Sequence, residues 1–543
     1  MKKRLIALLL AAMMVFALAA CGNSTPAPAA SSAPAESAAP KEEAPAAEPA
    51  AAPAEAAPAE ETELFSEART LRVALTSEPT TMDATQTVDT WSSTMFTNIY
   101  ETLLEVNDQG ELAPKLAESY NIVDDTTYDF TIRKGVKFHN GDELTVNDVV
   151  FSLNRAKDAP ILASFTADIE SVEALDDSTV RVHLSQISAP FLTYMTHPSL
   201  VIYSERAVTE AGEDYYKNPV GTGPYMLEKW DMGVGITLKY FEDYRGETPD
   251  FTTVELRFIP EATSRSIELE AGSVDLITDV AAVDLSRVES GEGIGLATGV
   301  GTAIRFLGMN CSAAPLNDVR VRQAIAYAID AEAINKALNL GYGTVATAPV
   351  SEAIMYSSKV GVNEFNLEKA KELLTEAGYP NGLDITLSTD TRKEYNDVCV
   401  IIQQQLAKAG INVTLDTTEW AVFLDKTYQG DTQLFMLGYG CTTPDPDTVF
   451  YPCFHSANKG PQGGMAYLED EEVDSLIDAT RAELDPVKRG EIYEELQARL
   501  AEIKPWVYLY DTTVYDGINT NKVAEIDVNG SQIQSYYSVK MVK

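Results

Sequence analysis

Three short runs, "LDITLST" (383–389), "INVTLDTTE" (411–419) and "QLFMLGYG" (433–440), decide the fold. They are rich in β-branched and aromatic residues, as strands are. The run "NDVCVIIQQQLAKAG" (396–410) separates the first two strands with apolar residues at helical spacing, and a short helix is expected over 420–428. Strands that alternate with helices form βαβ units, so this part of the chain predicts a parallel, doubly wound α/β sheet.

The flanking sequence extends this pattern in both directions. Before residue 260 the chain is rich in strand-like runs, with a capping-box start at Thr145 and Asp148 and a hairpin turn at 176–178. A strand over 506–511 precedes a tail that we expect to be rich in strands. Helices are expected over 91–105, 318–330, 367–379, 470–484 and 486–503.

The first 21 residues predict a lipoprotein export signal. Lys2, Lys3 and Arg4 precede an unbroken apolar run over 5–20, which is short for a spanning helix, since that needs about 20 residues. The run ends in "LAAC" at 18–21, which resembles a bacterial lipobox. The resemblance implies that Cys21 is the lipidated N-terminus of the mature protein, at the extracytoplasmic face of the cell membrane.

Residues 22–63 are almost entirely Ala, Pro, Glu, Ser and Thr, with no aromatic residue. Such a stretch cannot bury enough apolar surface to fold, so it predicts a disordered Ala/Pro/Glu tether. The chain carries 41 basic and 82 acidic side chains, which argues against a nucleic-acid partner and against adsorption to anionic lipid. We therefore expect the lipid, rather than charge, to hold the protein at the membrane.

The loop "YGCTTPDPD" (439–447) follows the third strand, and Arg392 follows the first. Ligands of open α/β sheets bind beyond the carboxyl ends of the strands. Both segments are therefore predicted to lie at the edge of a ligand cleft.

Six stretches, in order, resemble the extracytoplasmic solute-binding proteins of ABC importers, family 5, the peptide, nickel and opine type. They are "EPTTMDA" (78–84), "TYDFTIRKGVKFHNGDELTVNDVVFSLNR" (127–155), "NPVGTGPYMLEKW" (218–230), "LNDVRVRQAIAYAID" (316–330), "AKELLTEAGYPNG" (370–382) and "TPDPDTVFYPCFHS" (443–456). The resemblance covers nearly all of 67–543.

The resemblance implies a type II periplasmic-binding-protein fold, with two lobes that close about a hinge. Lobe one would comprise 64–100, 219–303 and 507–543, and lobe two 304–506. An extra α+β subdomain over 101–218 would belong to lobe one. Closed, liganded lobes would present the surface that the permease recognises.

The resemblance also implies where the ligand binds. Peptide-binding relatives hold the ligand ammonium with an aspartate four residues before the proline that here is Pro446, but this chain has Thr442 there. Asp445 or Asp447 can replace it only if the loop is shifted. Arg392 lies near the expected carboxylate anchor, which a planar guanidinium suits. The expected contacts are Asp89, Thr90, Trp91, Arg392, Trp420, Tyr439, Gly440, Cys441, Thr442, Thr443, Asp445 and Asp447.

Cys441 and Cys453 permit two further hypotheses. They are a candidate disulfide, because an extracytoplasmic compartment permits oxidation and the separation allows a closed loop. Together with Asp445, Asp447 and His455 they offer metal-ligand side chains, but their spacing matches no structural zinc pattern. We expect no resident metal and no cofactor.

Catalytic motifs are lacking in the sequence. The four histidines are scattered, and no nucleophile elbow or phosphate loop is found. We therefore expect a monomeric receptor, not an enzyme, which captures a short peptide or peptide-like solute and delivers it to the permease and ATPase of an ABC importer. The alternative is a sensory or metal/metallophore-binding lipoprotein of the same fold.

Overall fold

The computed structural model describes residues 69–107, 110–340, 342–361, 364–461 and 463–543. Cys21, the expected signal and the expected tether lie outside the described residues. Everything below concerns the described part of the chain.

One mixed sheet dominates the described residues. Its strand order is β14-β13-β15-β12-β16-β11-β1-β10-β9-β8. In that order the bounds are Ile411–Thr418, Leu383–Asp390, Leu434–Gly440, Ile294–Met309, Trp506–Asn519, Leu276–Ile277, Thr70–Leu75, Thr253–Phe258, Gly235–Tyr240 and Tyr225–Asp231.

The βαβ prediction is confirmed where it was made. β13 pairs in parallel with β14 and with β15, and α12 (Lys393–Lys408) and α13 (Trp420–Tyr428) form the crossovers. The sheet does not remain parallel, however, because β15 pairs with β12 antiparallel. Periodicity along one strand cannot reveal this, since strand direction depends on a partner from a distant part of the chain.

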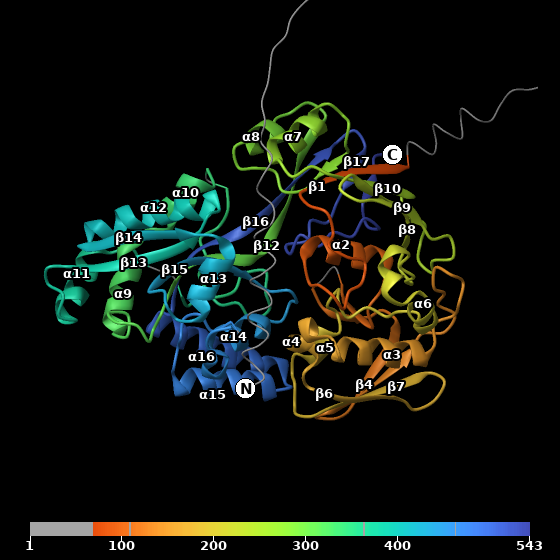
Figure 1. Cartoon of the computed structure of the whole chain (residues 1–543), viewed down its shortest axis with the longest axis horizontal. Coiled ribbons are helices and arrows are strands. Elements are labelled where there is room, and N and C mark those ends of the chain that lie inside the picture. The colour runs from red at the N-terminus through yellow and green to blue at the C-terminus, as the bar shows by residue number, and fades with distance from the viewer. Residues whose placement is uncertain (1–68, 108–109, 341, 362–363, 462) are drawn as a thin grey trace, which may run out of the picture. The chain divides into compact units, whose positions relative to one another are not determined.

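Two long antiparallel strands, β12 and β16, run side by side through the middle of this sheet (Figure 1). Their register shifts between Val300 and Ile304, and again between Arg305 and Phe306. The predicted crossings between the lobes, near residues 303 and 506, fall within this pair of strands. The predicted boundaries of the two lobes and the subdomain remain an interpretation.

The helices occupy most of the predicted positions. The predicted helices over 470–484 and 486–503 form α15 (Glu471–Ala482) and α16 (Pro486–Ile503), which pack against each other (Figure 1). The remaining helices are α2 (Thr90–Ile99), α3 (Val146–Lys157), α4 (Ala163–Thr166), α5 (Phe191–Tyr194), α6 (Glu205–Ala211), α7 (Ala262–Glu270), α8 (Leu285–Glu289), α9 (Val319–Ala328), α10 (Ala331–Leu338), α11 (Leu367–Glu376) and α14 (Asp447–Phe454), with 3-10 turns at Pro160–Leu162, Gly212–Lys217 and Ser456–Asn458.

The segment expected to be the extra subdomain contains its own sheet and core. Four antiparallel strands are ordered β4-β5-β7-β6, with bounds Ala117–Asp124, Thr127–Ile132, Thr179–Leu184 and Ile169–Ala174. The capping box at Thr145 and Asp148 is present at the start of α3, and Asp176 accepts the Ser178 N–H in the predicted hairpin turn. An apolar cluster that includes Phe130, Val149 and Phe191 fills the space beneath this sheet.

Two predicted elements differ from the structure. The helix expected over 91–105 ends at Ile99, because Tyr100 is extended and its hydroxyl donates to the Met82 carbonyl. The next residues form β2 (Leu104–Val106), which pairs with β3 (Leu112–Pro114). The strand-rich tail is reduced, after β16, to β17 (Val523–Glu525) and β18 (Lys540–Met541) within the described residues.

Candidate functional site

The loop after β15 lies at the meeting point of two pockets. The first has a volume of about 320 Å³ and the second about 700 Å³, and Thr302, Cys441 and Thr442 line both. Binding pockets for small molecules typically measure roughly 300–1,000 Å³. The predicted position of the ligand cleft, beyond the carboxyl end of this strand, therefore coincides with a cavity of suitable size.

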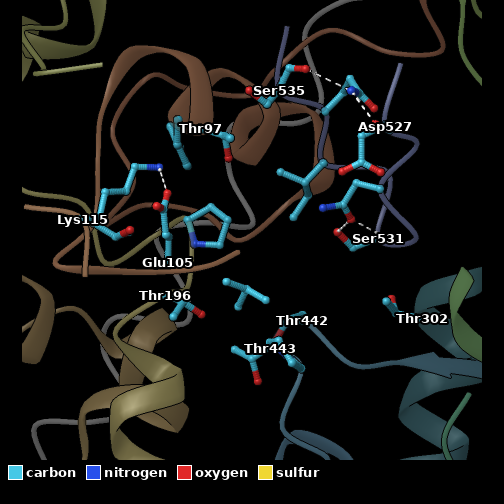
Figure 2. A pocket seen from close by; sticks show the side chains of 18 of the residues that line it. Thr97, Glu105, Lys115, Thr196, Thr302, Thr442, Thr443, Asp527, Ser531 and Ser535 are labelled. Carbon is cyan, nitrogen blue, oxygen red and sulfur yellow. Dashed lines mark hydrogen bonds and ion pairs between the residues drawn. The ribbon is translucent and has the colours of Figure 1, made fainter. Parts of the chain in front are cut away.

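The smaller pocket has a mixed lining, in which hydroxyl and charged side chains stand beside apolar ones such as Phe96 and Val201. Figure 2 shows Thr196, Thr442 and Thr443 gathered at one side of it and Asp527, Ser531 and Ser535 at another. These residues come from segments that are far apart in the chain. Such a lining offers hydrogen-bond donors and acceptors together with apolar surface, which suits a ligand that has both polar and apolar groups.

Five of the predicted contacts line these pockets. Thr90 and Gly440 line the larger pocket, Thr443 lines the smaller one, and Cys441 and Thr442 line both. Thr442, the residue that stands at the expected ammonium position, is exposed. None of the seven other predicted contacts is among the residues that line these two pockets.

Asp89 and Trp91 lie at the start of α2, the first helix that approaches the cleft. Asp89 caps the N-terminus of α2 and accepts from the Ser92 N–H at 2.9 Å. Burial alone would raise the pKa of Asp89, but hydrogen bonds from Ser92, Thr80 and Thr87 outweigh it and lower the pKa. Trp91 is half-buried and packs against the apolar cluster around Phe96. Both residues therefore help to position the neighbouring Thr90, which does line the cleft.

Arg392 immediately precedes α12, and its guanidinium is already engaged. Its Nε donates to Asp390 Oδ2 at 2.8 Å, and its backbone N–H donates to Oδ1 of the same carboxylate at 2.7 Å. The guanidinium also lies 4.1 Å from the ring centre of Tyr395 and 4.7 Å from that of Trp420. Trp420 is 44% exposed. Arg392 and Trp420, both predicted ligand contacts, therefore stack on each other, and neither lines the two pockets.

Asp445 is a structural carboxylate. It is fully buried and forms a bidentate ion pair with Arg489 of α16, with Arg489 Nη2 at 3.0 Å from Asp445 Oδ1. Arg489 also donates to the Thr480 carbonyl at 2.7 Å. The idea that a shifted loop could present this aspartate to a ligand ammonium is therefore not supported by its geometry.

Asp447 also points away from the cleft and joins distant parts of the chain. Its Oδ2 accepts from the Tyr194 hydroxyl at 2.5 Å, and its Oδ1 lies 3.4 Å from Arg481 Nε. Arg481 contacts Asp168 as well, and its carbonyl accepts from the Ala189 N–H at 2.8 Å. Burial raises the pKa of Asp447 to about 6, although Arg481 opposes the shift. This polar cluster ties the expected subdomain to the expected second lobe just behind Thr442 and Thr443.

The candidate disulfide between Cys441 and Cys453 is not formed in this structure. Cys441 and Cys453 are both free and buried, within one apolar cluster that also includes Phe450 and Tyr508. Burial raises the pKa of Cys441 to about 12, so the thiol stays protonated and behaves as a small apolar side chain. Tyr439 packs against the same cluster, and the proximity of Cys453 and burial raise its pKa.

Sequence reasoning singled out none of the charged residues that line the larger pocket, among them Arg305 and Asp511. Arg305 comes from β12, lies 3.7 Å from Glu394 and stacks over the Tyr395 ring at 5.4 Å. Asp511 comes from β16. Little in the sequence indicates that these two residues line a pocket. Both lie in strands whose other residues are largely apolar, and a single charged residue in such a strand does not by itself indicate a binding site.

The segment 529–534 was missed as well. Asn529, Ser531, Ile533 and Gln534 line the smaller pocket, although they lie about ninety residues beyond the predicted loop. Nothing local in this polar stretch marks it as a binding segment. The tail reaches the cleft because it packs against α2, where the Asn98 side-chain amide donates a hydrogen bond to the Gln534 carbonyl at 2.8 Å.

Two further findings concern other classes of site. Among the described residues, no group of three His, Cys, Asp or Glu side chains is arranged to hold a metal ion. No described helix is long and apolar enough to cross a membrane.

A cleft between two strands of a mixed sheet, a loop at a strand's carboxyl end and a distant tail is typical of a protein that binds a small molecule. Comparison with known proteins specifies the class. Residues 111–461 match the bacterial extracellular solute-binding proteins, family 5. The chain belongs to this family, whose members bind solutes for ABC importers and are not enzymes.

Individual relatives resemble the chain over most of its length. The glutathione-binding protein GsiB of Salmonella choleraesuis is 29% identical over 454 residues, which cover 81% of this chain and 89% of the relative. The structure of HbpA2 from Haemophilus parasuis matches with a TM-score of 0.80 at 28% identity, covering 87% of this chain and all of the other. DppA from Helicobacter pylori, solved in complex with the peptide STSA, matches with a TM-score of 0.75 at 27% identity and covers 88% of this chain and all of the other.

Proposed function

We propose that this protein is the lipid-anchored receptor of an ABC importer and that it captures a short peptide or peptide-like solute in the cleft around Thr442. One observation carries the choice of ligand: the cleft combines a guanidinium, from Arg305, with several carboxylates and many hydroxyl groups. Peptides present both an anionic and a cationic end and a chain of amide groups between them. The ligands named for GsiB and for DppA belong to the same chemical class.

The expected contacts Thr90, Gly440, Cys441, Thr442 and Thr443 are part of this proposal. For the carboxylate end, two arginines compete: Arg392, expected from the family resemblance, and Arg305, which lines the larger pocket. Arg305 is 22% exposed on its side chain and its nearest described acidic group, Glu394, is 3.7 Å away. A pair at that distance is weak, so Arg305 can exchange it for a ligand carboxylate at little cost.

The test is a thermal-shift screen of the chain without its first 21 residues against di- to hexapeptides, glutathione and non-peptide solutes. A ligand at a hundredfold excess over its Kd adds about 2.7 kcal/mol of stability, which such a screen detects easily. Native mass spectrometry of freshly purified protein identifies any cargo that co-purifies. Stabilisation by another solute class, with none by any peptide, would overturn the choice of ligand.

Arg305→Gln and Arg392→Gln form a matched pair for the anchor. We expect Arg305→Gln to weaken a carboxylate-bearing ligand at least tenfold, because a charge-assisted hydrogen bond contributes about 1.5–3 kcal/mol. Arg392→Gln is then expected to leave the Kd within about twofold, since the side chain lies against Asp390 and Trp420. The reverse outcome would restore Arg392 as the anchor.

The lipid anchor is tested separately. We propose that Cys21 carries the lipid and that residues 22–63 let the receptor reach its permease. Expression with labelled palmitate should mark the wild-type chain and leave Cys21→Ser unlabelled and released from the membrane. A labelled Cys21→Ser chain would contradict the anchor, and recovery of a monomer without permease subunits after mild crosslinking would contradict delivery.

A further inference from the structure

The larger pocket has an acidic wall. Its charged lining consists of Arg305 and four carboxylates, from Asp279, Glu394, Asp397 and Asp511. Three of these carboxylates face a basic side chain in the structure, although at different distances. Asp397 pairs with Lys393 at 2.5 Å, Glu394 lies 3.7 Å from Arg305, and Asp279 lies 4.0 Å from Arg265.

Asp511 is the exception. Only 5% of the residue is exposed, and its Oδ1 is fully buried with no hydrogen-bond partner among the described residues. Its backbone is satisfied, because the N–H donates to the Thr344 carbonyl at 2.9 Å. A buried carboxylate without a partner is costly, so such groups in proteins usually have a functional explanation.

The charged residues near Asp511 do not neutralise its carboxylate. The charged groups that act on its carboxyl are Glu352, which opposes ionisation, and Lys359, which favours it. Lys359 is 79% exposed and its nearest described partner is Glu352, at 3.9 Å, so it does not neutralise the buried carboxylate. Burial and then Glu352 raise the pKa of Asp511 to about 7, so part of the carboxyl groups stay protonated in the unliganded protein at neutral pH.

A second aspartate of the same strand shows that a buried carboxylate on β16 can have a hydrogen-bond partner. Asp516, five residues further along β16, is also buried and has a pKa raised to about 7 by burial. It has a partner, however, because its Oδ1 accepts from the Asp279 N–H at 3.1 Å. Asp516 does not line either of the two cleft pockets. Of these two aspartates of β16, the one without a hydrogen-bond partner is therefore the one that lines the cleft.

The ladder between β12 and β16 places Asp511 and the proposed carboxylate anchor on adjacent rungs. Asp511 pairs with Ile304, and Tyr510 pairs with Arg305. Because side chains on adjacent rungs point to opposite faces of a sheet, the two charges do not contact each other, although both residues line the same pocket. Asp445 and Asp447, the other carboxylates near Thr442, are already held by Arg489 and Arg481.

We propose that Asp511 binds a cationic group of the ligand, an ammonium or a guanidinium, and so supplies the charge that Thr442 lacks. This inference rests on the proposed function and specifies its ligand class as solutes with a free amino or guanidino group. The incoming cation would satisfy the carboxylate oxygen that the empty protein leaves without a partner. Affinity for the cation then depends on the ionised form of Asp511.

The experiment compares peptides that have a free α-amino group with the same peptides acetylated at that group. Calorimetric titration of the tightest peptide from the screen is expected to show at least a tenfold weaker Kd after acetylation. For the free peptide, the affinity should rise between pH 5.5 and pH 7, because the carboxyl loses its proton towards pH 7 while the peptide α-amino group, with a pKa of about 7.7–8.0, stays mostly protonated. Neither measurement requires a variant, so both remain informative if substitution impairs folding.

Asp511→Asn and Asp516→Asn are the matched variants. Asp511→Asn should bind the free and the acetylated peptide with equal affinity and lose the pH dependence. Asp516→Asn, which also removes a buried carboxylate from β16, should keep the wild-type discrimination. Equal binding of both peptides by the wild type, or unchanged discrimination in Asp511→Asn, would overturn the assignment.

The experiments distinguish a failure of the cation site from a failure of the proposed peptide-binding function. If no peptide binds but a non-peptide amine such as spermidine stabilises the wild type and not Asp511→Asn, the peptide proposal fails and the cation site stands. If peptides bind irrespective of their amino group, the peptide proposal stands and the cation site fails. A screen in which no peptide and no amine stabilises the protein overturns both.

Discussion

Asp445→Asn tests whether the acidic loop after β15 is a structural anchor or a ligand contact. The carboxylate is fully buried and Arg489 is 5% exposed, so the pair is shielded from water on both sides. Removing one partner of such a pair typically destabilises a protein by about 3–5 kcal/mol, because the other charge remains buried. Burial alone would lower the pKa of Arg489, but in the wild type Asp445 outweighs burial and raises the pKa. The variant loses this compensation, yet Arg489 stays charged because a guanidinium is not deprotonated in proteins.

The contacts that Arg489 keeps in the variant place the expected loss of stability within this range. Arg489 keeps its hydrogen bond to the Thr480 carbonyl and a longer one, 3.3 Å, to the Tyr493 hydroxyl. The Asn side chain preserves the volume and can still accept one hydrogen bond. We therefore expect a loss near the lower limit, about 3 kcal/mol in the free energy of unfolding.

Urea unfolding followed by tryptophan fluorescence measures this loss. Trp506 is a suitable reporter, since it is buried in the same apolar cluster as Tyr493. Glu372→Gln, which breaks the exposed pair with Lys369, is the control and should change stability by less than about 1 kcal/mol. The double variant Asp445→Asn with Arg489→Met should recover most of the loss, because it leaves no uncompensated charge.

One result would refute the structural reading. If Asp445→Asn unfolds within 1 kcal/mol of the wild type but binds ligand much more weakly, Asp445 contacts the ligand in solution. The loop would then adopt a different arrangement when liganded.

Three other expectations concern single groups. His197 is buried and its pKa is lowered to about 3, so the folded protein excludes a proton that the unfolded chain takes up below about pH 6.5. Stability should fall as the pH drops from 6.5 towards 3, and His197→Gln should reduce that fall in urea midpoints measured at pH 7 and pH 4.5; equal pH effects would contradict this. Tyr194→Phe leaves Asp447 Oδ2 without its donor and should cost about 1–3 kcal/mol of stability, with an unchanged urea midpoint as the contrary result. Cys441 and Cys453 should resist iodoacetamide in the native protein and react after unfolding, whereas failure to react when unfolded would indicate a disulfide.

Local sequence patterns predicted the elements that depend on short-range interactions. The helix over 420–428 begins and ends where it was expected, and the capping box at Thr145 is present. The segment 91–105 was harder, because its helix stops when Tyr100 reaches the distant Met82 carbonyl. Apolar periodicity indicates where a helix lies, but it does not distinguish the end of a buried helix from the start of a short strand. Which of the two forms there depends on contacts with residues elsewhere in the chain.

For the site, the sequence by itself predicted a ligand cleft at the loop after β15, since a loop at the carboxyl end of a strand in an α/β sheet lies at the edge where ligands of this fold class bind. Thr442 and Thr443 line the cleft accordingly. Only the tertiary structure decided which charges face it. Asp445 and Asp447 are adjacent to those threonines in sequence but are held by Arg489 and Arg481, whereas Arg305 and Asp511 come from two strands about two hundred residues apart. A charge is available to a ligand only if no other residue satisfies it, and the residues that satisfy it are set by the fold of the whole chain.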